Sequence, residues 1–200
     1  MKLAFLGGSF NPIHIGHLAL AEQVRCLGYD KVLFIPVNIP PHKMLASGAS
    51  SRERLEMLHL AVDSNPDFAV DSCEIERSGV SYTYETVRYL NKSYAGELEA
   101  KPALIMGWDQ ALGFNTWNRP DEIASNADII IARRPDDLTG NSFIQDKIDF
   151  PYPHILLKNA PLAISSSAVR EKIKSGGAWR YLVPDEVYRY IIKNNLYGYC

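Results

Sequence analysis

Short apolar runs alternate with helical patterns along the chain, and this alternation limits the folds that it can adopt. The runs typical of buried strands are residues 3–6, 31–36, 103–107, 128–135 and 154–158. Helices are expected over residues 15–27, from Ser51 onward, and over 83–92, 166–175 and 185–194. Because helices between strands favour parallel pairing and cover the sheet, we expect an α/β fold. Its sheet should be doubly wound and mainly parallel, with helices on both faces.

The remaining segments are less regular. Residues 37–51 contain Pro40 and Pro41 followed by small polar residues, which indicates a long surface loop. Residues 68–77 favour one or two short strands, and residues 136–153 are polar and loop-like. Without a repeat or a break in composition, and with 46% hydrophobic residues, residues 1–200 are expected to form a single domain with a Rossmann-like topology.

Charge and cysteine content exclude several classes of protein. The 21 basic and 23 acidic residues give a formal net charge of −2, which argues against charge-driven nucleic-acid binding. The apolar runs are too short for a signal peptide or a membrane span. Cys26, Cys73 and Cys200 are widely spaced and odd in number, so a disulfide framework or a structural zinc site is not expected. A reducing cytoplasm is the predicted compartment.

The sequence GGSFNPIHIGH, residues 7–17, joins the first predicted strand to the first helix. Gly7 and Gly8 allow the backbone to approach a ligand, and a helix N-terminus offers unpaired N–H groups to an anion. His14 and His17, just before the helix and in its first turn, point imidazoles into the same space. These features indicate a phosphate-binding turn. The fingerprints GxGxxG and GxxxxGK[ST] are both absent, which disfavours a dehydrogenase and a Walker-type ATPase.

Other polar motifs also follow predicted strands. VNIPPHK, MGWD and ARRP come directly after strands, and ISSSAVR opens a helix after a strand and a short loop. Ligands of parallel α/β sheets collect beyond the carboxyl ends of the strands, near the switch in strand order. We therefore expect these motifs to share one site.

Two of these motifs carry a resemblance to a known superfamily. GGSFNPIHIGH resembles the GxFDPxHxGH signature of the nucleotidyltransferases that include adenylyl- and cytidylyltransferases, and ISSSAVR, about 150 residues later, resembles their ISSTxIR signature. Five further motifs resemble, in the same order, those of the bacterial nicotinate-nucleotide adenylyltransferase family. They are IPVNIPPHK, SYT at residues 81–83, MGWD followed by Trp117, ARRP and YLVPDEVYRYIIKNNLY. The resemblance covers essentially the whole chain.

The resemblance implies a reaction between ATP and nicotinate mononucleotide that gives deamido-NAD and pyrophosphate. Mg²⁺ would accompany ATP, and the phosphate of the mononucleotide would attack the α-phosphorus directly, so no covalent enzyme intermediate is expected. The implied partners are these small molecules, with neither nucleic acid nor membrane. A homo-oligomer is left open.

The resemblance also implies site residues. The catalytic donors to the ATP phosphates are His14 and His17. The residues implied in ATP binding are Gly7, Gly8, Ser9, Phe10, Asp109, Arg134, Ser166, Ser167 and Arg170. Those implied in binding the mononucleotide are Asn38, Lys43, Tyr82, Thr83 and Trp117, with Trp117 stacking on the pyridine ring. No protein-held metal site is implied.

Several of these residues have a plain structural alternative. One of Ser166 and Ser167 could simply cap a helix, and Arg170 or Lys43 could be surface charge. Trp117 could be core packing, and Arg133 could replace Arg134. Two positions depart from the family pattern: Asn11 replaces an aspartate, which indicates a structural role, and Val37 stands where asparagine is frequent, so that Asn38 could take over its contact.

Other functions remain open at this level. An adenylyltransferase could act on nicotinamide mononucleotide or phosphopantetheine, although SYT and Trp117 favour a pyridine nucleotide. The lack of an obvious acidic cluster near SYT favours the acid over the amide. A hydrolase with zinc on His14, His17 and His42 is a different class, and H-x-x-H is only weakly typical of metal sites. A catalytically silent nucleotide-binding module is a third.

Overall fold

The computed structural model describes residues 1–41, 48–133, 148–158 and 162–199. Within these ranges six strands form one sheet in the order β3-β2-β1-β4-β5-β6, and every neighbouring pair is parallel. The strands are β1 (Leu3–Gly8), β2 (Lys31–Pro36), β3 (Phe68–Val70), β4 (Ala103–Gly107), β5 (Asp128–Ala132) and β6 (Ile155–Leu157). The mainly parallel sheet expected from the sequence is therefore confirmed.

Strand β1 lies at the centre of the sheet, where the winding changes direction. It pairs with β2 along its whole length, from Leu3 opposite Lys31 to Gly8 opposite Pro36. On its other side Ala4, Phe5 and Leu6 pair with residues 103–105 of β4. Along the chain, β2 and β3 are added on one side of β1, and β4, β5 and β6 are then added on its other side. The carboxyl ends of β1 and β4 thus flank the switch point, where ligands bind in such sheets.

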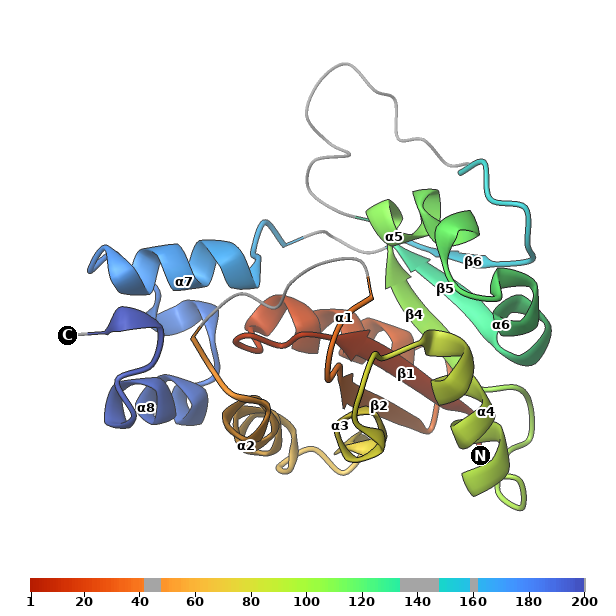
Figure 1. Ribbon diagram of the computed structural model, residues 1–200, viewed down its shortest axis with the longest axis horizontal. Helices are drawn as coiled ribbons and strands as arrows, with labels where there is room; N and C mark the ends of the chain where they lie inside the picture. The colour runs from red at the N-terminus through yellow and green to blue at the C-terminus, as the bar shows by residue number, and fades with distance from the viewer. Residues whose placement is uncertain (42–47, 134–147, 159–161, 200) are drawn as a thin grey trace.

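Along each strand, the side chains of successive residues point to opposite faces of the sheet. Ala4, Leu6, Val32 and Phe34 pack into one buried cluster, and Leu3, Phe5, Leu33 and Ile35 pack into the other. The first face is covered by α1 (Ile15–Arg25), α2 (Ser51–Val62), α7 (Ser166–Lys174) and α8 (Asp185–Lys193). The second is covered by α3 (Cys73–Arg77), α4 (Thr83–Ser93), α5 (Trp108–Leu112) and α6 (Pro120–Asn126). The predicted doubly wound arrangement, with helices on both faces, is confirmed (Figure 1).

Of the one or two short strands expected over residues 68–77, the structure contains one, and the second half of this segment is a helix. Strand β3 ends at Val70, and the side chain of Asp71 then accepts a hydrogen bond of 2.9 Å from the backbone N–H of Cys73. This aspartate turn starts α3, which buries Cys73 and Glu74. The correction matters because α3 leads directly to the SYT segment.

Other boundaries differ by a few residues. Helices α5 and α6 were not expected, and three 3-10 turns at Phe114–Thr116, Arg180–Leu182 and Leu196–Gly198 complete the helical elements of the described residues. Strand β5 ends at Ala132 and strand β6 covers only Ile155–Leu157, so both are shorter than expected. Of the predicted loop 136–153, only residues 148–153 lie in the described ranges. Among these ranges, no helix has the length and apolar character needed to cross a membrane.

Candidate active site

The turn after β1 is built around two glycines and a buried phenylalanine. Phe10 has a φ of 44° and its ring is only 1% exposed, so the left-handed backbone turns this side chain down into the core. A Cβ added to Gly8 would lie 3.1 Å from that ring, which explains the glycine. A Cβ added to Gly7 would meet nothing within 4 Å, so there is open space at the end of the strand. The ring of Phe10 is therefore part of the core and not a surface for a ligand.

The two histidines of the turn stack on each other. Their ring centroids are 3.6 Å apart with an angle of 23° between the planes. The backbone N–H of His14 donates to Nδ1 of His17 over 3.2 Å. Because Nδ1 accepts this bond, the proton of a neutral His17 ring is on Nε2. His17 therefore offers a hydrogen-bond donor at the start of α1.

His14 is held in its neutral form by burial. Its side chain is 5% exposed, and desolvation lowers its pKa to about 4. A Cβ added to Gly16 would lie 3.0 Å from Nδ1 of His14, so the third glycine of the motif makes room for this ring. The neutral ring of His14 and the ring of His17 thus lie together beside the N-terminus of an 11-residue helix.

Helix α7 contacts the same turn, which brings the two ends of the chain together. Ser166 donates through Oγ to the main-chain oxygen of Pro12 over 2.8 Å, and Arg170 donates through Nη1 to that of Asn11 over 2.6 Å. Arg170 also donates to Oγ of Ser167 over 3.1 Å. Asn11 itself is 1% exposed, consistent with a structural role. The expected meeting of GGSFNPIHIGH with ISSSAVR is therefore observed.

The cap of α7 is a serine that the sequence analysis did not single out. Ser165 lies at the N-cap, and its side chain accepts a hydrogen bond of 3.2 Å from the backbone N–H of Ala168. Ser166 and Ser167 begin the helix proper. The helix is therefore capped by Ser165, and not by Ser166 or Ser167, for which capping was considered.

A fully buried arginine lies beneath the turn and was also missed. Arg54 of α2 is 0% exposed and donates from Nη1 to the main-chain oxygen of Ser9 over 2.8 Å. From Nη2 it donates to the main-chain oxygen of Val37 over 2.8 Å and to Oγ of Ser51 over 3.1 Å. Arginine in an amphipathic helix is normally exposed, so no pattern in the sequence indicates this contact.

The segment expected to bind the mononucleotide is joined to the end of β2. The backbone N–H of Asn38 donates to Oγ of Ser81 over 2.9 Å, and Nδ2 of Asn38 donates to the main-chain oxygen of Gly79 over 3.0 Å. The backbone N–H of Ser81 donates in turn to the oxygen of Ile39 over 2.8 Å. Tyr82 then occupies the N-cap of α4, and Thr83 is its first residue. Asn38 is therefore joined to the segment that leads into Tyr82 and Thr83.

A buried carboxyl group lies behind that segment. Glu74 of α3 is 5% exposed and accepts a hydrogen bond of 2.6 Å from Oγ1 of Thr86. Burial raises its pKa, although the hydroxyls of Thr86 and Ser81 favour its charged form. One buried carboxyl group therefore lies behind the SYT segment, near which the sequence shows no obvious acidic cluster.

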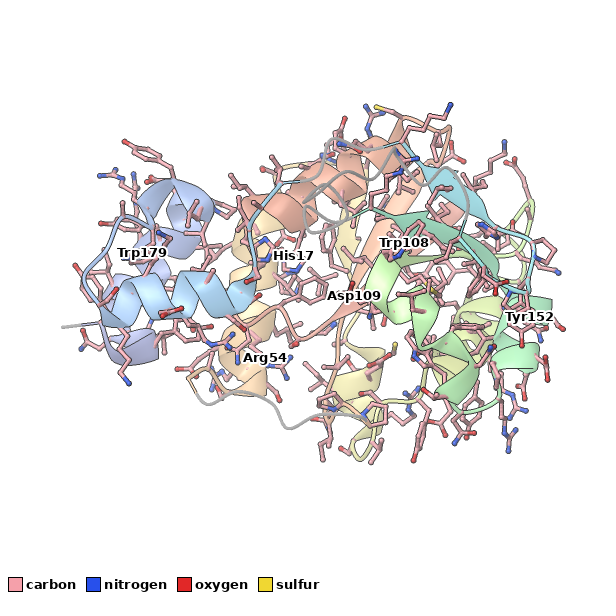
Figure 2. The ribbon with its side chains drawn as sticks, turned by 90° about the horizontal axis from the view of Figure 1, so that it is seen from above. His17, Arg54, Trp108, Asp109, Tyr152 and Trp179 are labelled. Carbon is pink, nitrogen blue, oxygen red and sulfur yellow. The ribbon has the colours of Figure 1, made fainter. Side chains whose placement is uncertain are left out.

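At the end of β4, Asp109 lies in the first turn of α5 and is exposed. It follows the strand that pairs with β1, on the other side of the switch point from the phosphate-binding turn. Figure 2 shows His17, Arg54 and Asp109 gathered near the middle of the molecule, between α7 and α5. Trp117 is half-buried with its ring 5.2 Å from that of Phe114, so it also packs against the core.

Three residues weighed in the sequence analysis, His42, Lys43 and Arg134, lie outside the described residues. Arg133 directly follows β5. In the described ranges, no three His, Cys, Asp or Glu side chains are grouped so as to hold a metal ion. The hypothesis of a zinc hydrolase gains no support there, since Nδ1 of His17 already accepts a hydrogen bond.

One open groove of about 500 Å³ lies apart from the phosphate-binding turn. It is lined by Cys73, Glu76, Arg77, Glu85, Arg88 and Tyr89 of α3 and α4. It contains none of the site residues expected from the sequence, so the convergence of motifs at the sheet edge, rather than this groove, defines the candidate site.

Comparisons with known proteins agree with this arrangement. Residues 5–172 match the model of the cytidylyltransferase-like family. The chain is 41% identical over 202 residues to a Treponema pallidum protein named "Probable nicotinate-nucleotide adenylyltransferase", covering 98% of this chain and 99% of the relative. It is 37% identical to a Geobacillus thermodenitrificans protein of the same name, covering 98% and 86%.

The fold also matches a solved structure. The nicotinic acid mononucleotide adenylyltransferase of Plasmodium falciparum, complexed with APC, superposes with a TM-score of 0.75. The match covers 100% of this chain and 98% of the other, at 18% sequence identity. At that identity the match supports the shared fold.

Proposed function

The chain belongs to the nicotinate-nucleotide adenylyltransferases within the cytidylyltransferase-like family, and from this membership we infer its reaction. The enzyme transfers the adenylyl group of ATP to nicotinate mononucleotide, which gives deamido-NAD and pyrophosphate and serves NAD biosynthesis. The observation that carries this function is the 41% identity to a relative of that name over 98% of the chain. The joined phosphate-binding turn and α7 supply a site of the required kind.

We propose that the turn at residues 7–17 holds the phosphates of ATP. The N–H groups at the start of α1 attract anions, and Nε2 of His17 adds a donor whose proton is fixed by the bond at Nδ1. His14 is kept neutral by burial and stacks on His17. Donors that are already oriented stabilise the negative charge that develops on the phosphates in the transition state.

The remaining ATP contacts are assigned by position. The open space at Gly7 would admit the nucleotide at the end of β1. Asp109 would contact the ribose hydroxyls, and Gly8, Ser9 and Phe10 would lie along the nucleotide. Arg134 lies outside the described residues, so its proposed contact with ATP rests on the family resemblance alone. Since Ser166 and Arg170 already donate to the main chain of the turn, they would support its shape as well as bind phosphate, with Ser167 beside them.

The acceptor would lie across the switch point from ATP. The N-terminus of α4 offers unpaired N–H groups to the nicotinate carboxylate at Tyr82 and Thr83. Trp117 would stack on the pyridine ring, and Asn38 and Lys43 would bind the rest of the mononucleotide. The acceptor phosphate attacks the α-phosphorus, so the protein orients both substrates and contributes no nucleophile.

Mg²⁺ is proposed as part of the ATP substrate. Magnesium usually retains several waters and binds phosphate oxygens with one or two carboxylates, and the described residues contain no cluster able to hold it by themselves. The triphosphate would therefore carry the ion into the site.

The cytoplasmic location and the single domain over residues 1–200 stay predictions. Whether the protein is a homo-oligomer stays an open question.

The test is to incubate the purified protein with ATP, Mg²⁺ and a panel of acceptors: nicotinate mononucleotide, nicotinamide mononucleotide and phosphopantetheine. Pyrophosphate release is followed for each, and the product is identified by mass. Deamido-NAD formed in equal amount to pyrophosphate supports the proposal. Hydrolysis of ATP without a joined product, or transfer only to phosphopantetheine, would refute it.

A further inference from the structure

The buried guanidinium of Arg54 bridges two loops that belong to different halves of the site. One donor group holds Ser9 in the phosphate-binding turn after β1, and the other holds Val37 at the start of the loop after β2. Ser9 adjoins the residues proposed to hold ATP, whereas Val37 adjoins Asn38, which is joined to the acceptor segment through Ser81. A single side chain thus connects the ATP side with the acceptor side.

The surroundings of Arg54 make this bridge rigid. The side chain is 0% exposed, and in the described part of the chain no carboxylate forms an ion pair with it. Its partners are main-chain oxygens and the hydroxyl of Ser51. Burial lowers its pKa, but arginine remains charged in proteins. An apolar side chain could fill such a place at lower electrostatic cost, so stability alone does not account for the guanidinium.

The C-terminal turn lies near Arg54. Tyr197 is 8% exposed, and a Cβ added to Gly48 would lie 2.5 Å from its ring, so the ring lies directly against the segment that leads into α2. Burial raises the pKa of the Tyr197 hydroxyl, and the charges of Arg170 and Arg54 oppose that rise, so Arg54 lies near this hydroxyl. Because Arg54 is 0% exposed, water is kept from the guanidinium, and hydrogen bonds in such an environment are stronger than in water.

We propose that Arg54 is a positioning residue that sets the distance between the bound ATP and the acceptor phosphate. This inference rests on the proposed function and deepens it. In-line transfer depends on the separation and direction of the two reacting groups, and an error of about 1 Å can cost about 100-fold in rate. Loss of Arg54 should therefore reduce kcat while each substrate, bound by its own half of the site, keeps its KM.

The central variant is Arg54→Lys. Lysine keeps the charge but is a single point donor that cannot hold two main-chain oxygens on separate loops in the geometry of a planar guanidinium. We expect kcat to fall by about 10- to 100-fold, with the KM values for ATP and nicotinate mononucleotide each within about threefold of wild type. Arg52→Ala is the matched control, because Arg52 is exposed on the same helix two residues earlier.

Two further measurements separate positioning from folding. Far-UV circular dichroism and Tm show the folded fraction, to which kcat is normalised. In Arg54→Ala, added methylguanidinium should restore part of kcat, whereas ethylammonium, with one donor group, should not. A wild-type kcat in folded Arg54→Lys, a loss explained entirely by the unfolded fraction, or a rise in one KM alone would overturn the inference.

The inference and the proposed function fail in different ways. If the wild-type enzyme transfers adenylyl groups to another acceptor, the proposed acceptor is wrong, and the ratio of kcat for Arg54→Lys to wild type is measured with that acceptor. If the wild type makes deamido-NAD but Arg54→Lys keeps its kcat, the function stands and the role of Arg54 is wrong.

Discussion

In the turn at residues 7–17, the protonation and hydrogen bonding of a side chain depend on its neighbours as much as on its residue type. Nδ1 of His17 accepts the N–H of His14, which leaves Nε2 as the donor. The sequence predicted both histidines but not this proton arrangement. It also gave no sign of Arg54 or Glu74, because charged residues are expected on the surface and their burial depends on neighbours far along the chain.

Replacement of His17 by alanine removes a donor from the charge that builds up in the transition state. We expect kcat to fall by about 100-fold or more, as for loss of one oriented donor elsewhere. Steady-state rates of pyrophosphate release at saturating ATP and nicotinate mononucleotide measure this. His59→Ala is the control, since His59 is exposed on α2 and pairs with Asp63. A kcat within twofold of wild type in His17→Ala would remove His17 from the catalytic role.

Burial of His14 should appear in the pH dependence of stability. Its folded pKa of about 4 lies below the ordinary histidine value of 6.5, so between these values the unfolded chain binds a proton that the folded chain does not. The free energy of unfolding therefore falls as the pH drops from 6.5 towards 4. Urea titrations across pH 4–7 should show a steeper loss for wild type than for His14→Gln. Parallel curves for the two proteins would contradict a buried, neutral His14.

At the scale of elements, the length of a segment determined how well it could be predicted. Helices α1, α2, α4, α7 and α8 have 9 to 12 residues, long enough to show a helical period, and all were expected. Helices α3 and α5 have five residues each and α6 has seven, too short for such a period. The start of α3 depends on one aspartate turn, so the sequence left open whether residues 73–77 form a second short strand, and the helix was not expected.

Helix α2 positions Arg54 through its first turn, so the cap of this helix supports the site. Ser50 accepts a hydrogen bond from the backbone N–H of Glu53 over 3.3 Å, and Glu53 accepts one from that of Ser50 over 2.7 Å. Ser50→Ala should lower the free energy of unfolding by about 1 kcal/mol. Ser50→Thr, which keeps the capping hydroxyl, should stay within about 0.5 kcal/mol of wild type. Urea unfolding at pH 7 measures both, and equal stability of Ser50→Ala and wild type would contradict this role of the cap.

At the scale of the whole molecule, the parallel sheet brings distant motifs to one edge. The order β3-β2-β1-β4-β5-β6 places the ends of β1 and β4 side by side, and α7 returns to the turn after β1. Strand–helix alternation was enough to predict this edge, because parallel strands all end on the same side. The contacts that connect its halves, through Arg54 and Ser81, depend on side-chain packing that no linear pattern contains.

The choice between acid and amide acceptors is a property of the assembled site. Helix α4 presents its N-terminus towards the proposed position of the nicotinate ring, which favours a carboxylate. Glu74 lies behind the segment, where burial raises the pKa of its carboxyl group. The N-terminus of α4 therefore predicts a preference for the mononucleotide with the negatively charged ring.

The most direct test is to measure kcat/KM for nicotinate mononucleotide and for nicotinamide mononucleotide with the same enzyme, at saturating Mg²⁺ and ATP. We expect nicotinate mononucleotide to be preferred by at least about tenfold, equal to about 1.4 kcal/mol of transition-state stabilisation. Equal values, or a preference for nicotinamide mononucleotide, would contradict the proposed recognition of the acceptor carboxylate.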